Sequence, residues 1–105
     1  MTRLQMIEAR IKAATPGKCW VDALQSNGCE VQLFDRTYTV WLTRSKQTPV
    51  EQTERDAHLI AHAPSDLSAL VSALRIAVRE LTELSEGDAH SIAGQALAEI
   101  AKVVG

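Results

Sequence analysis

The sequence predicts one α+β domain over residues 1–105, built on a three-stranded antiparallel sheet that is packed by helices and followed by a C-terminal antiparallel helical hairpin. β-Branched and aromatic residues with two turn signals fill the segment 19–43. Apolar residues recur at helical spacing on both sides of that segment. The expected order is therefore α-β-β-β-α-α-α, with a helix–sheet–helix part in 1–64 and the hairpin in 65–105.

Composition bounds the classes of function. Hydrophobic residues make up 46% of the 105 and charged residues 23%, as in an ordinary globular chain. The net charge of −2 removes the simplest electrostatic argument for binding a phosphate backbone. The two cysteines are too few for a disulfide framework and lack the CxxC spacing of zinc sites. No apolar run is long enough to span a membrane or form a signal core, so we expect a cytoplasmic protein.

The first expected helix covers residues 2–14. Its apolar stripe consists of Leu4, Ile7, Ile11 and Ala14. Thr2 and Gln5 have the spacing of a capping box, in which each side chain bonds to the backbone N–H of the other residue. Pro16-Gly17 ends the helix, because proline cannot continue it.

Two turn signals, Asn27-Gly28 and Asp35-Arg36, connect the three expected strands. Two-residue turns centred on them make Leu24 face Val31 in the first hairpin and fix an equivalent register in the second. Both turns then place apolar residues on one common face, with Asp22 as its only charged member. The expected core face comprises Trp20, Leu24, Cys29, Val31, Leu33, Tyr38, Val40 and Leu42.

The opposite face of the sheet is mostly polar, with Val21, Phe34 and Trp41 as apolar exceptions. Aromatic side chains dominate the energetics of protein contacts. These three residues therefore predict a surface for a partner protein. The alternative is that the C-terminal hairpin of the same chain covers them.

The helices after the sheet are bounded by caps and by a proline. Thr48, followed by proline in the first turn and a glutamate three residues after the cap, predicts a helix to about Ala63. Pro64 is expected to break it, and Ser65 to cap a further helix that ends near Gly87. Asp88 is the expected cap of the last helix.

The two last helices should pair as an antiparallel hairpin, because their connection is short. The line of apolar residues along these two helices, here called the seam, would stay exposed on an isolated hairpin. We therefore expect the seam to pack against a second copy of the chain in a homodimer. The alternative is that the hairpin packs on the sheet of its own chain. The expected interface residues are Leu67, Leu70, Leu74, Leu81, Leu84, Ile92, Leu97 and Ile100.

Glu54, His58 and His62 recur at i, i+4 spacing and should share one helix face. Two histidines so placed can reach one metal ion, but the HExxH pattern of zinc proteases fails because Leu59 follows the first histidine. A solvated polar face is the competing interpretation. We therefore expect no resident metal, no cofactor and no catalytic residue, with His58 and His62 as the only metal candidates.

A nucleic-acid surface is a further alternative. Arg36, Arg44 and Lys46 are expected near one end of the sheet, where Trp41 could stack on a base. Glu30 should lie across from Trp41, and its charge opposes this interpretation.

Two segments are similar to those of a known group of proteins. The first runs from Ile7-Glu8-Ala9-Arg10 through Ala14-Thr15-Pro16-Gly17 to Trp20, and the second is Asp56–Asp66, DAHLIAHAPSD. Together they resemble small uncharacterised proteins of actinobacteria and their bacteriophages, in which ATPGPW precedes a short sheet and DAxFIAxAxxD precedes a long helix. Lys18-Cys19 and Leu59 depart from that pattern. The resemblance implies a phage or prophage accessory protein that contacts host proteins.

The sequence thus predicts a non-catalytic accessory protein that dimerises through its C-terminal helices and binds a host protein. The alternatives are a nucleic-acid-binding accessory protein and a metal-binding protein or enzyme that uses His58 and His62.

Overall fold

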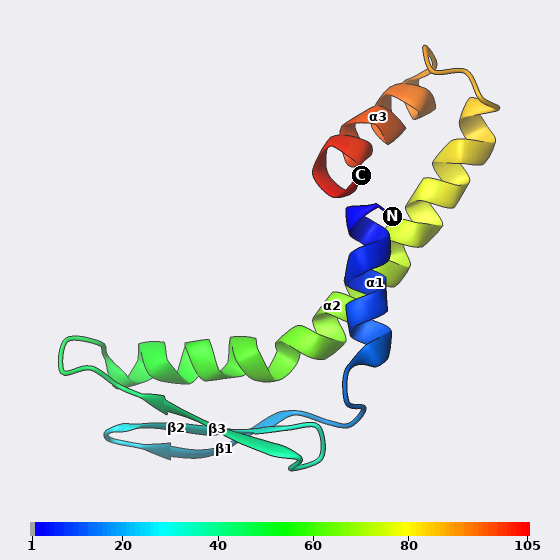
Figure 1. The fold of residues 1–105 in the computed structure, drawn as a ribbon. Coiled ribbons are helices and arrows are strands. Elements are labelled where there is room, and N and C mark those ends of the chain that lie inside the picture. Colours follow the sequence, from blue (N-terminus) through cyan, green and yellow to red (C-terminus); the bar gives the residue numbers. More distant parts are fainter. Residues whose placement is uncertain (1) are drawn as a thin grey trace. The chain divides into compact units, whose positions relative to one another are not determined.

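The computed structural model describes residues 2–105 (Figure 1). Its elements follow in the order α1 (Arg3–Ala13), β1 (Trp20–Gln25), β2 (Gly28–Leu33), β3 (Tyr38–Thr43), α2 (Val50–Ser85) and α3 (Ile92–Val104). The three strands form one antiparallel sheet in the order β1-β2-β3. The predicted α+β class, with a three-stranded sheet and C-terminal helices, is confirmed.

The chain divides into two compact units. The sheet unit comprises Ala14–Asp66, and the helical unit comprises Leu67–Gly105 together with the chain up to Ala13. α2 therefore contributes its first part to the sheet unit and its second part to the helical unit. α1 belongs to the helical unit, although the sequence pattern predicts it beside the sheet. That the two units make one domain stays a prediction.

The register of the second hairpin, between β2 and β3, is the predicted one. Leu33 pairs with Tyr38, and Glu30 pairs with Trp41. The turn residues Asp35 and Arg36 both have positive φ, as a two-residue hairpin turn requires. The amide of Thr37 closes this turn by donating to the carbonyl of Phe34.

The register of the first hairpin differs from the prediction. Leu24 pairs with Cys29 instead of Val31, and the strands are joined by a turn that is centred one residue earlier than expected. A bulge between Val21 and Ala23 shifts the register once more. Because side chains alternate along a strand, one extra residue exchanges the faces of everything beyond it. Val21 consequently packs against the core, and Trp20 pairs with Gln32 on the opposite face.

The core of the sheet unit is formed by Cys29 and Val31 of β2 and by Ala57 and Ala61 of α2. Val31 and Cys29 have no exposed surface. The two alanines lie one helical turn apart, and their small side chains let the helix approach the sheet closely. Partly buried residues complete this layer: Cys19, Val21, Leu33, Val40 and Leu42.

α2 continues through Pro64, so the predicted break at this residue is wrong. Pro64 has no N–H for the carbonyl one turn earlier, which is why proline usually interrupts helices. The hydroxyl of Ser65 donates to the carbonyl of His62, and Ala61 is held in the core on the preceding turn. Packing before the proline thus offsets the lost backbone hydrogen bond.

Of two helix caps predicted from the sequence, the structure contains the first and replaces the second. Thr2 and Gln5 form the expected capping box, since each backbone N–H donates to the side chain of the other residue. At α3, Ser91 and not Asp88 is the N-cap, and its hydroxyl oxygen accepts from the amide of Gly94. Asp88 instead accepts from the amide of His90 in the turn before the helix.

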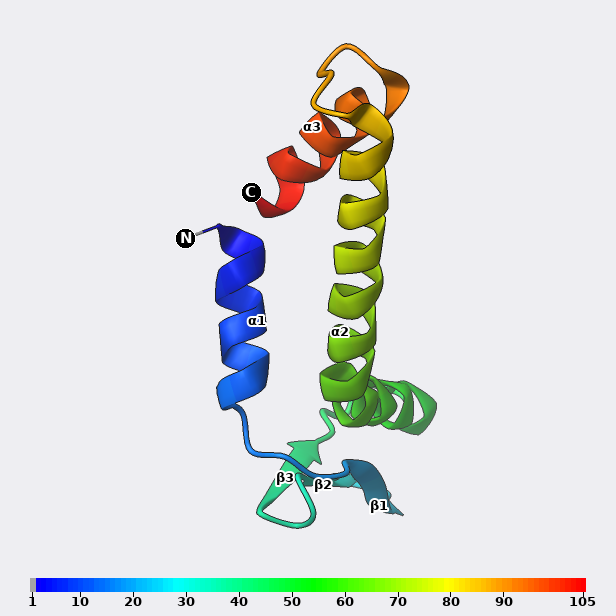
Figure 2. The ribbon, with the colours of Figure 1, turned by 90° about the vertical axis from the view of Figure 1, so that its right-hand side faces the viewer.

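In the helical unit, α1 lies beside the second part of α2, and α3 leads back from the end of α2, as Figure 1 and Figure 2 show. Leu4 of α1 is buried, and Glu8 accepts a hydrogen bond from Nε of Arg75 at 2.7 Å. This hydrogen bond lowers the pKa of Glu8 and raises that of Arg75. Among the helices described, none has the length and apolar character needed to cross a lipid bilayer.

Candidate functional site

The three residues predicted as a partner surface, Val21, Phe34 and Trp41, differ in where the structure places them. Trp41 is 40% exposed, and its cross-strand partner Glu30 confirms its place on the face away from the core. Phe34 is half-buried in the turn between β2 and β3 and meets the ring of Tyr38 edge-on at 6.5 Å. Val21 is wrong as a surface residue, because the bulge in β1 turns it toward the core. Trp20 takes its place beside Gln32.

A hydrogen-bonded network occupies the middle of this outer face. Gln32 is only 3% exposed although it lies on the face that α2 does not cover. Its Nε2 donates to Oδ2 of Asp22 at 3.2 Å and to Oε1 of Glu30 at 2.5 Å. Its Oε1 accepts from the hydroxyl of Thr39 at 2.9 Å. One buried amide therefore orients two carboxylates, as buried polar groups require partners for each donor and acceptor.

The first of these carboxylates lies beside a bound cation. The guanidinium of Arg36 lies over the ring of Trp20, 5.2 Å from its centroid, and 3.9 Å from Oδ2 of Asp22. An aromatic face and a carboxylate both attract a guanidinium group. The sheet unit thus contains a cation site that is made of Trp20 and Asp22 and is filled by Arg36 of the same chain.

The second carboxylate, Glu30, lies across from Trp41. The Trp41 ring rests on the backbone of Gly28, where a Cβ atom would come within 2.8 Å of Cζ2 of the indole. Glycine at this position leaves the space that the ring occupies, because a Cβ atom would clash with it. Trp41 and Glu30 take part in no salt bridge or cation–π contact in the described part of the chain.

The residues of the predicted self-interface all belong to the helical unit. None of them is buried. Leu67, Leu70, Leu84 and Ile92 are 45%, 67%, 73% and 89% exposed. The other four, Leu74, Leu81, Leu97 and Ile100, are half-buried. Ile76 and Val103, which are not among the predicted interface residues, are also more than half exposed.

The predicted metal candidates lie on one face of α2. The rings of His58 and His62 are stacked with centroids 6.1 Å apart, and Nε2 of His58 is 4.0 Å from Oε1 of Glu54. The described residues contain no group of three or more side chains placed to hold a metal ion. Two imidazoles alone supply fewer ligands than a zinc site uses.

The predicted cluster of basic residues near one end of the sheet is wrong. Arg36 precedes β3 and Arg44 follows it, so a strand of six residues, about 20 Å long, separates them. Nε of Arg44 donates to the carbonyl of Ser26 at 2.7 Å, and its Nη1 donates to the carbonyl of Thr48 at 2.8 Å. Arg36 is held on Trp20.

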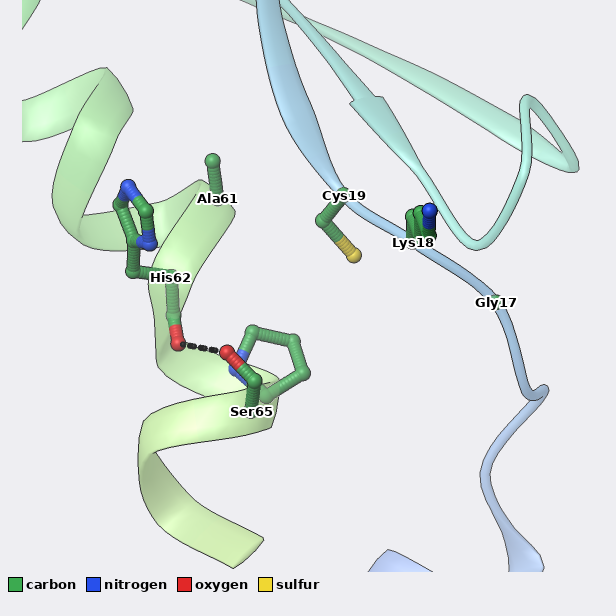
Figure 3. Close-up of a pocket in the computed structure, with 7 residues that line it drawn as sticks. Gly17, Lys18, Cys19, Ala61, His62 and Ser65 are labelled. Carbon is green, nitrogen blue, oxygen red and sulfur yellow. Dashed lines mark hydrogen bonds between the residues drawn. The ribbon is translucent and has the colours of Figure 1, made fainter. Parts of the chain in front are cut away.

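A pocket of about 280 Å³ lies within the sheet unit, between the segment before β1 and α2 (Figure 3). Cys19 and His62 both line it. Sγ of Cys19 accepts from the amide of Phe34 at 3.4 Å, and no hydrogen bond joins this thiol to His62 in the part of the chain described. A base within hydrogen-bonding distance is one way to activate a cysteine nucleophile, and the hydrogen bond described for this thiol comes from a backbone amide instead.

Sequence reasoning missed Trp20 and Asp22 on the outer face, and it missed the hydrogen bonds that Gln32 makes there. Alternation along β2 already placed Gln32 and Glu30 there. Asp22 carried the signal that could have found the rest, because a carboxylate on an apolar face indicates that the strand changes face before it.

In comparisons with known proteins, no family model, no curated protein and no solved structure matches this chain. The resemblance of the two segments to actinobacterial and phage proteins therefore stays a prediction. Two surfaces of the chain remain as candidate functional sites: a seam of exposed aliphatic residues on the helical unit, and an aromatic and polar face on the sheet unit.

Proposed function

We propose that the protein is a non-catalytic interaction module of the cytoplasm that pairs with a second copy through its helical unit and binds another protein through its sheet. The resemblance noted above supports an accessory role in actinobacteria or their phages, with a host protein as the partner. Nucleic acid and metal ions are not its ligands in this proposal.

The observation that carries the proposal is the exposure of the seam. Leu4 is the only large apolar side chain that the described part of the helical unit buries. Leu70, Leu84 and Ile92 are each at least two-thirds exposed. Leaving such residues in water forgoes about 1.5–3 kcal/mol for each side chain. A second copy supplies an identical seam and can cover all of them by two-fold symmetry.

The test is the mass in solution, measured by size exclusion with light scattering. The wild type should have twice the 11.5 kDa mass of one chain. Leu70→Glu with Leu84→Glu should have the mass of one chain, because a charge on each seam residue cannot be buried against its copy. Both residues are largely exposed in one chain, so the variant should keep its helical circular dichroism.

Leu59→Glu is the matched control. Leu59 lies on the same helix and is 69% exposed, compared with 67% for Leu70, but it belongs to the sheet unit. Its substitution should leave the mass at twice that of one chain. A wild-type mass of one chain would refute self-association, and equal effects of the two sets of variants would refute this seam as its location.

A further inference from the structure

The outer face of the sheet contains two pairs that each combine an indole and a carboxylate, one within β1 and one across β2 and β3. On one side, Trp20 and Asp22 hold the guanidinium of Arg36. On the other side, Trp41 and Glu30 face each other across β2 and β3. Both carboxylates are oriented by the same amide, Nε2 of the buried Gln32. The two pairs differ in that, among residues 2–105, a cation contacts the first pair and none contacts the second.

We infer that Trp41 and Glu30 form a recognition site for an arginine side chain of a partner protein. This inference rests on the proposed function and deepens it by naming the chemistry of the partner. The guanidinium would lie over the indole of Trp41 and contact the carboxylate of Glu30, as Arg36 does with Trp20 and Asp22.

Charge complementarity favours a cation over other occupants. Asp22 already has the counter-charge of Arg36, whereas no salt bridge of residues 2–105 includes Glu30. The pair of Trp41 and Glu30 therefore has one charge, the negative charge of Glu30, and this charge disfavours a phosphate or an acidic peptide as the ligand. Trp41 is 40% exposed, so a ligand can reach its ring.

The site is also preorganised. The ring of Trp41 is seated on Gly28, and the carboxylate of Glu30 is held at 2.5 Å by Gln32. Both groups therefore lose little conformational freedom when a ligand binds. Arginine suits them better than lysine, because its planar guanidinium stacks on an indole while it donates to a carboxylate.

The experiment titrates the full chain with the peptide acetyl-Gly-Arg-Gly-Arg-Gly-amide and follows the indole N–H signals of Trp41 and Trp20 by NMR. A saturable shift of the Trp41 signal is expected, with a smaller change at Trp20. The same peptide with citrulline in place of arginine has the same shape and no charge. It should produce no saturable shift, and citrulline binding as tightly as arginine would overturn the inference.

Two variants test the two groups, each with a matched control. Glu30→Gln should weaken arginine binding about two- to fivefold, as expected for one exposed ion pair. Glu51→Gln, at an exposed carboxylate of the same unit, should leave it unchanged. Trp41→Leu, followed at the amide of Glu30, should weaken binding by about the same factor. Tyr38→Leu removes an aromatic ring that is 56% exposed and should have no such effect.

The remaining outcomes separate this inference from the self-association. Leu70→Glu with Leu84→Glu should bind the arginine peptide like the wild type, because the site lies in the sheet unit. A chain with twice the mass of one copy that does not bind the peptide would overturn only the arginine site. A Trp41 signal that shifts with protein concentration, without peptide, would show that a second copy occupies the site and would also overturn the inference.

Discussion

The two thiols of the chain have different surroundings. Cys29 has no exposed surface, and its burial raises the pKa of the thiol, with a smaller contribution from the carboxylate of Glu54. Cys19 is half-buried and lines an open pocket. A thiol reacts as its thiolate and only where a reagent reaches it. At Cys29, burial blocks the reagent and the raised pKa lowers the fraction of thiolate, so both effects reduce the reactivity of this thiol.

We expect iodoacetamide at neutral pH to alkylate Cys19 in the native protein while Cys29 stays unmodified. Mass spectrometry of the digested protein after short exposures measures both sites. In urea the two thiols should react at comparable rates, since the unfolded chain exposes both. Equal rates in the native protein would contradict the burial of Cys29.

Prediction from the sequence succeeded for the second hairpin and failed in part for the first. Leu33 and Tyr38 are flanked by a strand pattern with one apolar face, so the turn alone fixes their register. β1 begins with Trp20 and Val21, which are both apolar, so its pattern allows either residue to face the core. The bulge in β1 turns Val21 toward the core and Trp20 away from it, and it allows Gln32 to donate a hydrogen bond to the carboxylate of Asp22. Such a polar contact between neighbouring strands is not visible in the residue pattern of one strand.

The continuity of α2 through Pro64 leads to a prediction about this helix. Pro64→Ala should increase the free energy of unfolding by up to about 3 kcal/mol, because alanine restores the backbone donor and removes the clash with the preceding turn. Pro49→Ala is the matched control. Pro49 precedes the first residue of the same helix, where the N–H has no helical partner, so its substitution should change stability little.

Urea unfolding followed by circular dichroism measures both variants. A stabilisation by Pro64→Ala that exceeds that of Pro49→Ala supports a continuous helix. A loss of stability in Pro64→Ala would mean that the helix is interrupted at this residue, as the sequence pattern alone predicts.

The described part of the chain exposes more large apolar side chains than it buries. Five apolar side chains are buried in the described residues, whereas twelve large hydrophobic ones are exposed. The buried set is concentrated in the sheet unit, where Cys29, Val31, Ala57 and Ala61 form the core. The seam of the helical unit was recognisable in the sequence as a helical stripe, but its periodicity could not show which surface covers it. A stripe of the same spacing serves a core within one chain and an interface between two chains equally well.

Thermal unfolding distinguishes these two uses of the seam. If two copies bury it, association contributes to stability by mass action, and the wild-type Tm should rise as the protein concentration is increased a hundredfold. Leu70→Glu with Leu84→Glu should have a lower Tm that is independent of concentration, while Leu59→Glu should keep the concentration dependence. A wild-type Tm that stays constant would mean that the helical unit covers its seam within one chain. The exposed leucines of α2 would then have to be covered by α1 and α3 of the same copy, and charges at Leu70 and Leu84 would lower the Tm without changing the mass.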